Sequence, residues 1–343
     1  MGQGHVKMFQ GIKGCRVTAV CDAQAGCAAE VAGRFHVPAA YTTMTELLDR
    51  EDLDAVSVVT NDIAHRDPCL LAISRGLHVM CEKPLATTLA DAGMMARAAR
   101  KKKVLTAVNF SYRNAAGTQR AAELVREGKL GRIIHVEGSY LQSWLTSKAW
   151  GDWKTSPMFL WRLSTKHGSA GQLGDVGVHL YDLVSFVVGG IAELNCVLKT
   201  FDKGRKSIGE YVFDSNDSAV MNVRFQNGAV GTLHTSRWAT GHINTVALRV
   251  YGDKGSLDLN LDRPVAEQLR VCFGEKNRNT AVWKPVKCPK VPNTYERFIE
   301  AIKSGKQGQA GFDVGARVQA YLEYSRISAQ KHKFVTIPDP GKS

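Results

Sequence analysis

Apolar and polar positions follow a regular pattern through the first third of the chain. Short apolar runs that predict strands are separated by stretches of about 10–15 residues with apolar positions at helical spacing. The predicted strands are 16–21, 55–59, 77–81 and 104–108. The predicted helices are 6–10, 23–35, 45–50, 64–75 and 89–102. Strands alternating with helices in this way predict a parallel, doubly wound sheet of the Rossmann type.

The pattern changes after about residue 115. A helix at 116–127, a strand at 132–140, a tryptophan-rich loop at 144–161 and a helix at about 175–188 come first. The predicted strands that follow are 191–201, 218–225, 229–236, 245–251, 255–261, 268–273 and 281–286. Helices at 293–303 and 313–330 and a strand at 334–337 end the chain. We therefore predict two domains: residues 1–115 with the doubly wound sheet, and residues 116–343 as an α+β domain with a large, mostly antiparallel sheet.

Composition is that of an ordinary globular protein. The 343 residues are 44% hydrophobic and 22% charged, and no apolar run reaches the roughly 18 residues that a membrane span needs. The first ten residues lack the apolar core of an export signal. The eight cysteines are irregularly spaced, and no two of them form a Cys-x-x-Cys pair. This spacing disfavours a zinc site. We expect a cytoplasmic protein with no membrane partner and no bound metal.

The net charge is +13, which raises the possibility of a nucleic-acid partner. The basic residues are scattered, and their one short cluster, Arg100–Lys103, falls at a predicted helix end, where cations suit the helix dipole. A basic surface also attracts anionic ligands such as a cofactor pyrophosphate. We therefore predict no nucleic-acid partner.

The stretch His78–Ala86 carries the first chemical signal. Its apolar strand runs directly into Glu82 and Lys83, and Pro84 prevents the strand from continuing. Ligands of an open parallel sheet bind at the carboxyl ends of its strands. A neighbouring Glu and Lys are usually a solvated surface pair, but this placement favours a role in binding or catalysis.

Asp22 ends the predicted strand 16–21. An acid there accepts hydrogen bonds from the ribose hydroxyls of NAD and repels the 2′-phosphate of NADP. Asp22 also suits a helix N-cap, and the two roles are compatible. No cation follows it in residues 23–25, so NADP is the less favoured cofactor.

Gly2 lies 20 residues before Asp22, the separation expected between the glycine fingerprint and the ribose-binding acid. The first strand and the first two glycines of that fingerprint are missing. In a sheet of order 3-2-1-4-5-6 the first strand lies in the middle, so we expect strands 16–21 and 55–59 to flank a gap, or one of them to shift into it. We also expect the natural protein to begin about ten residues upstream, with an apolar strand and Gly-x-Gly.

Asp175 and His179 are four residues apart, which places them on one face of a helix. An aspartate beside a histidine orients the ring and favours the imidazolium form, as a proton acceptor requires. A buried histidine satisfied by a nearby carboxylate is the structural alternative. Glycines on both sides, Gly171, Gly174 and Gly177, allow close approach of a ligand and favour the catalytic interpretation.

Taken together, these motifs resemble the Gfo/Idh/MocA (glucose–fructose oxidoreductase / inositol dehydrogenase) family. Glu82-Lys83-Pro84 is similar to its Glu-Lys-Pro signature. The run from Ser169 to Asp182 resembles Gly-Gly-Gly-x-Leu-x-Asp-x-Gly-x-His-x-x-Asp, with Ser169 and Ala170 replacing the first two glycines. Three shorter segments also resemble family motifs: Thr60-Asn61-Asp62 with His65, Asn109 with Tyr112-Arg113, and Trp161-Arg162.

The resemblance implies hydride transfer between NAD and a secondary alcohol of a sugar, glycoside or cyclitol. His179 would take the hydroxyl proton with Asp175 steadying its charge, and Lys83 would hydrogen-bond the reacting oxygen. The implied cofactor-side residues are Gly2, Asp22, Thr60, Asn61, His65, Glu82, Lys83, Asn109 and Arg113. The implied substrate-side residues are Lys83, Tyr112, Trp161, Arg162, His167, Asp175 and His179. The resemblance also implies a homodimer or homotetramer assembled through the sheet of the second domain.

Two other functions are compatible with the same motifs. Some relatives oxidise a sugar transiently to permit glycosidic elimination, without net NADH production. Others bind the cofactor as regulators and do not turn over, although the presence of Lys83, Asp175 and His179 argues against this. The sequence does not identify the sugar or polyol.

Overall fold

The computed structural model describes residues 1–338, which form two compact units. The first contains Met1–Phe110 and Pro292–Ala316, and the second contains Ser111–Val291 and the residues from Arg317 onward. The predicted division after residue 115 therefore falls five residues too late (115 − 110) and omits the returning segment. That segment is bonded to the end of a strand in the first unit: the Val108 N–H donates to the Ala310 carbonyl at 2.7 Å, and the Phe312 N–H to Thr106 Oγ1 at 2.9 Å.

The first unit is built from parallel strands and helices, as predicted. Its strands are β1 (Ala19–Cys21), β2 (Ala39–Tyr41), β3 (Ala55–Val58), β4 (His78–Cys81) and β5 (Thr106–Val108). Its helices are α1 (Gly2–Gln10), α2 (Ala25–Phe35), α3 (Met44–Arg50), α4 (Arg66–Ser74), α5 (Leu89–Lys102) and α10 (Thr294–Ser304). The short strand β2, which follows Pro38, was missed from the sequence.

The strands of this unit form two separate sheets. β1 pairs with β2, and β3 pairs with β4, which pairs with β5, all in parallel. Within residues 1–338, no strand is hydrogen-bonded to both β1 and β3, and these two strands do not pair with each other. Neither strand has shifted to pair with the other, which agrees with the expectation of a gap between them.

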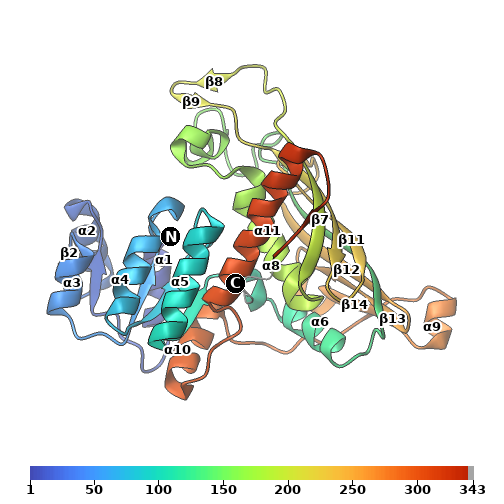
Figure 1. Cartoon of the computed structure of the whole chain (residues 1–343), viewed down its shortest axis with the longest axis horizontal. Helices are drawn as coiled ribbons and strands as arrows, with labels where there is room; N and C mark the ends of the chain where they lie inside the picture. The colour runs from blue at the N-terminus through green and yellow to red at the C-terminus, as the bar shows by residue number, and fades with distance from the viewer. Residues whose placement is uncertain (339–343) are drawn as a thin grey trace. The chain divides into compact units, whose positions relative to one another are not determined.

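The core of the first unit lies around β4 and β5, whose side chains are mostly buried. Helices α4 and α5 lie next to each other (Figure 1). Phe9 of α1 and Phe298 of α10 join Met80, Ala107 and Tyr295 in one apolar cluster. α1 and α10 are thereby anchored against the central strands β4 and β5.

The second unit is organised on a nine-stranded sheet in the order β15-β14-β13-β12-β6-β11-β10-β7-β16. β6 and β11 are parallel, and all other pairs are antiparallel. The strands are β6 (Ile133–Gln142), β7 (Ile191–Lys199), β10 (Ser218–Phe225), β11 (Val230–Ser236), β12 (Asn244–Gly252), β13 (Gly255–Asn260), β14 (Leu269–Phe273), β15 (Lys284–Pro285) and β16 (Val335–Thr336). The predicted large, mostly antiparallel sheet is confirmed.

Helices cover one face of this sheet. They include α6 (Ala116–Arg126), α8 (Val178–Val187) and the second-unit part of α11 (Phe312–Lys331). Tyr181 of α8 and Ser325 of α11 share a hydrogen bond at 2.5 Å, and Ser328 Oγ accepts from the Cys196 N–H of β7 at 2.9 Å. These contacts hold the two helices together on the sheet (Figure 1).

The remaining elements are short. A hairpin, β8 (Ser207–Ile208) and β9 (Tyr211–Val212), and the helices α7 (Pro157–Leu160) and α9 (Glu275–Asn279) complete the second unit. In the tryptophan-rich segment, Trp144 and Trp153 are buried in an apolar cluster with Phe159, whereas Trp150 is 40% exposed. Trp144 and Trp153 therefore belong to the packed interior and offer little surface to a ligand.

Candidate active site

Glu82 is the centre of a buried hydrogen-bond network at the end of β4. Its Oε1 accepts from His5 Nε2 at 2.8 Å and from Asn109 Nδ2 at 2.7 Å, and its Oε2 accepts from the Lys83 backbone N–H at 3.1 Å. Asn109 Nδ2 also lies 3.1 Å from Tyr295 Oη. Strand and helix ends from distant parts of the sequence thus converge on one carboxylate.

The network keeps Glu82 ionised. Burial by itself raises the pKa of a carboxyl group, but the bonds from His5, Asn109 and Lys83 outweigh it and lower the pKa of Glu82 to about 2. An ionised, fully engaged carboxylate is suited to orienting Lys83. Asn109 was expected on the cofactor side, but its side-chain N–H groups donate to Glu82 and Tyr295 inside this network.

His5 and Tyr295 were not identified from the sequence. A signal for His5 existed, because it shares the buried face of α1 with Val6 and Phe9, and a polar residue on a buried face requires a partner. Tyr295 carried no comparable signal, since its importance depends on α10 returning to the first unit nearly 200 residues after Asn109 (295 − 109 = 186).

The residues expected to hold the dinucleotide are compatible with one. α1 starts at Gly2, has no side-chain cap and no acid in its first turn, so its first backbone N–H groups are suited to a phosphate. A Cβ built on Gly2 or Gly4 would meet nothing within 4 Å. Asp22 is exposed at the end of β1 and accepts only the Gln24 N–H, at 2.9 Å from Oδ1, within the described residues.

The turn after β3 is stabilised by His65. Its ring is fully buried, with Nδ1 2.8 Å from the Pro84 carbonyl and Nε2 3.1 Å from the Thr60 carbonyl. The ring joins two turns and has no surface to present to a ligand. The expected cofactor-side role of His65 is therefore corrected to support of the backbone at Thr60 and Pro84. Thr60 and Asn61 themselves are exposed.

In the second unit the predicted helix at 175–188 begins differently. Residues Leu173–Gly177 form a π-helical turn, and α8 follows from Val178. π-helical turns are rare in proteins, and those that occur often lie at functional sites. A Cβ on Gly174 would lie 2.2 Å from that of Ala170, so this turn requires glycine.

The Asp175 carboxylate lies between two guanidinium groups. Its Oδ2 is 3.3 Å from Arg162 Nε and 3.9 Å from Arg237 Nη2. Arg237 is fully buried, donates from Nε to Gln172 Oε1 at 2.7 Å and from Nη1 to the Arg162 carbonyl at 2.9 Å. These cations share the negative charge that was expected to act on His179. Arg237 carried no sequence signal, because a single arginine after a strand is unremarkable.

His179 packs against two tyrosines. Its ring makes an edge contact with Tyr112 at 5.1 Å and a tilted contact with Tyr140 at 6.4 Å between centroids. The tyrosine hydroxyls lie 2.6 Å apart, and Asn244 closes a triangle: Tyr140 Oη donates to its Oδ1 at 2.8 Å, and its Nδ2 donates to Tyr112 Oη at 3.2 Å. Burial raises the pKa of both tyrosines, so both hydroxyls stay protonated.

Two further predicted residues have partners inside the second unit. Arg113 is buried and pairs with Asp182, its Nε lying 2.9 Å from Oδ2 and its Nη2 2.5 Å from Oδ1. This pairing corrects the expected cofactor contact of the Arg113 side chain, because its guanidinium is enclosed. His167 contacts Ser164 Oγ at 2.9 Å and Glu210 at 3.4 Å.

Trp161 and Arg162, expected on the substrate side, form a stacked pair. The Arg162 guanidinium carbon is 4.6 Å from the centroid of the Trp161 ring, within the range of cation–π attraction. Both side chains are half-buried. Arg162 thus joins the carboxylate of Asp175 to an apolar ring surface.

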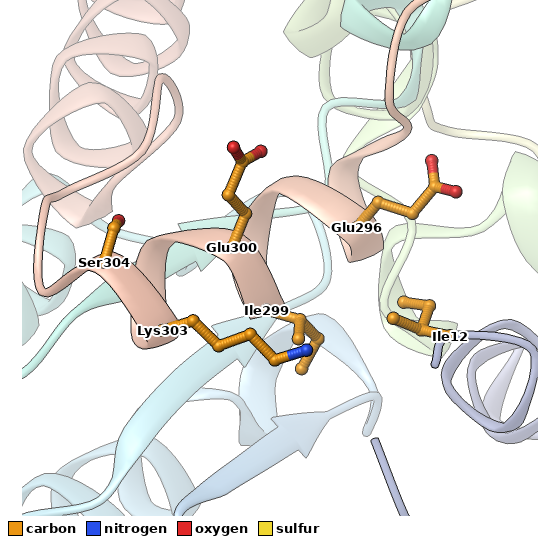
Figure 2. A pocket seen from close by; sticks show the side chains of 6 residues that line it. All are labelled: Ile12, Glu296, Ile299, Glu300, Lys303 and Ser304. Atoms are coloured by element: carbon orange, nitrogen blue, oxygen red, sulfur yellow. The ribbon is translucent and has the colours of Figure 1, made fainter. Parts of the chain in front are cut away.

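Figure 2 shows a surface pocket of the first unit. Its volume is about 410 Å³. It is lined by Ile12, Glu296, Ile299, Glu300, Lys303 and Ser304. None of the predicted site residues lines it, so it does not contribute to the candidate site. None of the helices in residues 1–338 is both long and apolar enough to cross a lipid bilayer.

Comparison with known proteins adds the evolutionary relationship. Two family models match: "Oxidoreductase family, NAD-binding Rossmann fold" over residues 1–110 and "GFO/IDH/MocA C-terminal domain" over residues 118–258. Levoglucosan dehydrogenase from Pseudarthrobacter phenanthrenivorans is 29% identical over 74% of this chain and 67% of its own. 1,5-Anhydro-D-fructose reductase from Ensifer adhaerens is 31% identical, over 78% and 73%.

Solved structures agree over nearly the whole chain. A levoglucosan dehydrogenase in complex with NADH and levoglucosan has a TM-score of 0.84 and 26% identity, covering 98% of this chain and 94% of its own. An oxidoreductase domain protein from Kribbella flavida has a TM-score of 0.86 and 27% identity, covering 98% and 96%. The chain therefore belongs to the Gfo/Idh/MocA family of oxidoreductases, and its first unit is the NAD-binding Rossmann fold of that family.

Proposed function

We propose that this protein is an NAD-dependent dehydrogenase that oxidises a secondary alcohol of a sugar, glycoside or cyclitol. The observation that carries the proposal is the setting of His179, whose ring is held against Tyr112 and Tyr140 in a chain of an NAD-binding oxidoreductase family. Both tyrosine hydroxyls are engaged with each other and with Asn244. The ring of His179 is therefore held in place by its neighbours within the second unit.

His179 would act as the general base. Its Nδ1 is buried in the protein, which leaves Nε2 as the nitrogen that accepts the proton of the substrate hydroxyl. Asp175 would favour the imidazolium that forms, with its charge moderated by Arg162 and Arg237. Arg162 and Trp161 would bind hydroxyls and C–H groups of the substrate, with His167 and Tyr112 at the margin.

Lys83 would hydrogen-bond the reacting oxygen through Nζ and stabilise its developing negative charge. Glu82 would hold the Lys83 backbone in place. NAD supplies the acceptor for the hydride that leaves the alcohol carbon. The N-terminus of α1 at Gly2 would bind its pyrophosphate and Asp22 its ribose hydroxyls, with Thr60 and Asn61 beside the nicotinamide half.

The names of the relatives support a cyclic polyhydroxylated substrate. They include levoglucosan dehydrogenase, D-glucoside 3-dehydrogenase and myo-inositol 2-dehydrogenase. A screen of anhydrosugars, glucosides, free hexoses and inositols with NAD, read by NADH absorbance, tests the proposal. NADH production with one class supports it, and binding of NAD without oxidation of any class contradicts it and favours a regulator.

Transient oxidation that permits elimination is the second candidate. One relative, 25% identical over 73% of this chain, is named 2,7-anhydro-N-acetylneuraminate hydratase. Such a reaction consumes substrate without net NADH, so product analysis beside the absorbance assay separates the two reactions.

A further inference from the structure

We propose that His5 is a positioning residue for Lys83 and acts on it through Glu82. The inference rests on the proposed function, in which Lys83 contacts the reacting oxygen. His5 lies on α1, the helix that starts at Gly2. The N-terminus of this helix would bind the cofactor, and His5 on the same helix would position Lys83.

The His5 ring is held from three sides. Its Nε2 is 2.8 Å from Glu82 Oε1, and its Nδ1 is 2.8 Å from Ser57 Oγ. Its ring makes an edge contact with Tyr295 at 4.9 Å and 85°. Only 2% of the residue is exposed. These contacts from β3, the end of β4 and α10 leave the ring one orientation.

Glu82 transmits that orientation to Lys83. A carboxylate is a rigid plane, so the donors at one oxygen determine where the other oxygen lies. His5 and Asn109 hold Oε1, while Oε2 accepts the Lys83 N–H at 3.1 Å. Loss of the His5 donor would allow the carboxylate to rotate, and the backbone at Lys83 would lose a fixed acceptor. A displacement of about 1 Å in a catalytic group costs up to roughly a hundredfold in rate.

The hydrogen bond to Glu82 does not depend on the charge of His5. In the neutral ring, Nε2 donates to Glu82 and Nδ1 accepts from the Ser57 hydroxyl. In the imidazolium, both nitrogens donate, and Ser57 accepts instead. The donor to Glu82 is therefore maintained in both states, and the positioning does not require a titrating group.

Two substitutions at position 5 separate the contacts. Glutamine places its amide nitrogen near the location of Nε2 and can preserve the donor to Glu82, whereas asparagine reaches only the location of Nδ1, near Ser57. We expect His5→Gln to keep kcat within about threefold with an unchanged pH profile, and His5→Asn to lower kcat roughly tenfold or more with little change in substrate KM. Val6→Ala, at a buried position of the same helix, is the control, expected to lower the melting temperature and leave kcat unchanged.

A second readout does not need turnover. The rate of Lys83 acetylation by acetic anhydride, followed by peptide mass spectrometry, should change in His5→Asn and not in His5→Gln. In addition, His5→Asn should lower kcat much less in a Lys83→Ala background, because both residues act through the same contact.

The outcomes are distinct. Equal behaviour of the glutamine and asparagine variants, or full additivity with Lys83→Ala, overturns the inference while the proposed function stands. If Lys83→Ala itself turns over normally, the role assigned to Lys83 fails, and the inference fails with it. If no substrate is oxidised at all, the proposed function fails, and equal acetylation rates would then reject the positioning of Lys83 as well.

Discussion

Tyr112 and Tyr140 share a hydroxyl–hydroxyl hydrogen bond of 2.6 Å beside the ring of His179. The contacts of Asn244 determine which atoms of this group donate and which accept hydrogen bonds. Its Oδ1 accepts from both Tyr140 and Gln142 Nε2, at 2.8 and 2.9 Å, so its Nδ2 is the atom directed at Tyr112. The three side chains thus form one closed set of donors and acceptors, which supports His179 from one side.

Changing this triangle should affect the proton acceptor. Tyr140→Phe removes one hydroxyl and should lower kcat about tenfold while costing about 1 kcal/mol of stability.

Asn244→Asp should raise the pH at which activity appears, because a nearby carboxylate favours the imidazolium form of His179. The measurement is the pH dependence of kcat/KM. Asn222→Asp, on an exposed position of β10, adds the same charge elsewhere, and an equal shift in that control would rule out the local effect.

Lys83→Ala and His179→Ala should each reduce turnover by roughly a hundredfold or more, the scale for losing a positioned proton-transfer or oxyanion group. NAD affinity, measured by calorimetry, should change much less for His179→Ala, because that residue is assigned to the substrate. A His179→Ala protein with near-normal turnover would exclude His179 as the base.

The doubly wound character of the first unit was predictable because each strand is a compact apolar run followed by a helix. The site residues at strand ends, Asp22 and Glu82, followed from the same pattern. The partners of Glu82 were not predictable. His5 bonds to it from 77 residues away along the chain (82 − 5), and Tyr295 bonds to Asn109 from 186 residues away (295 − 109).

In the second unit, too, contacts between residues far apart in the sequence could not be predicted. Asn244 lies opposite Gln142 in the register of β12 against β6, and Val246 lies opposite Tyr140. Periodicity predicts each strand but not which strands become neighbours, so the triangle beside His179 was not accessible from the sequence. The helix carrying Asp175 and His179 was predicted, but its π-helical first turn depends on close packing at Gly174 against Ala170.

Cofactor preference can be tested at the end of β1. Asp22→Ser together with Ala23→Arg should shift preference from NAD towards NADP, because the change removes a repelling carboxylate and adds a bidentate partner for the 2′-phosphate. Both positions are exposed, so the fold should tolerate the change. The ratio of kcat/KM for the two cofactors is the readout, and a wild-type protein that already prefers NADP would contradict the role of Asp22.

Assembly through the large sheet remains a prediction. Val220 and Val197 are cross-strand neighbours, 46% and 60% exposed, on the sheet of the second unit. Val220→Glu should produce monomers, because a charge at the centre of an interface between two copies would lose its hydration. Light scattering at micromolar concentration gives the mass. A monomeric wild-type protein would contradict the prediction, and Val212→Glu, on the separate hairpin β8–β9, is a control that should not change the mass.

The ionised state of Glu82 should make the protein sensitive to acid. The pKa of this carboxyl is lowered from 4.5 to about 2, so its bonds stabilise the fold fully above about pH 4.5 and lose that contribution as the pH falls towards 2. A shift of this size corresponds to a free energy of unfolding on the order of 3 kcal/mol. Glu82→Gln cannot titrate, so the stability difference between wild type and variant, measured by urea unfolding, should shrink across that interval. Glu300→Gln, an exposed carboxylate on α10, is the control and should follow the wild-type profile. A constant difference between wild type and Glu82→Gln from pH 6 to pH 3 would show that the buried network does not depend on the charge of Glu82.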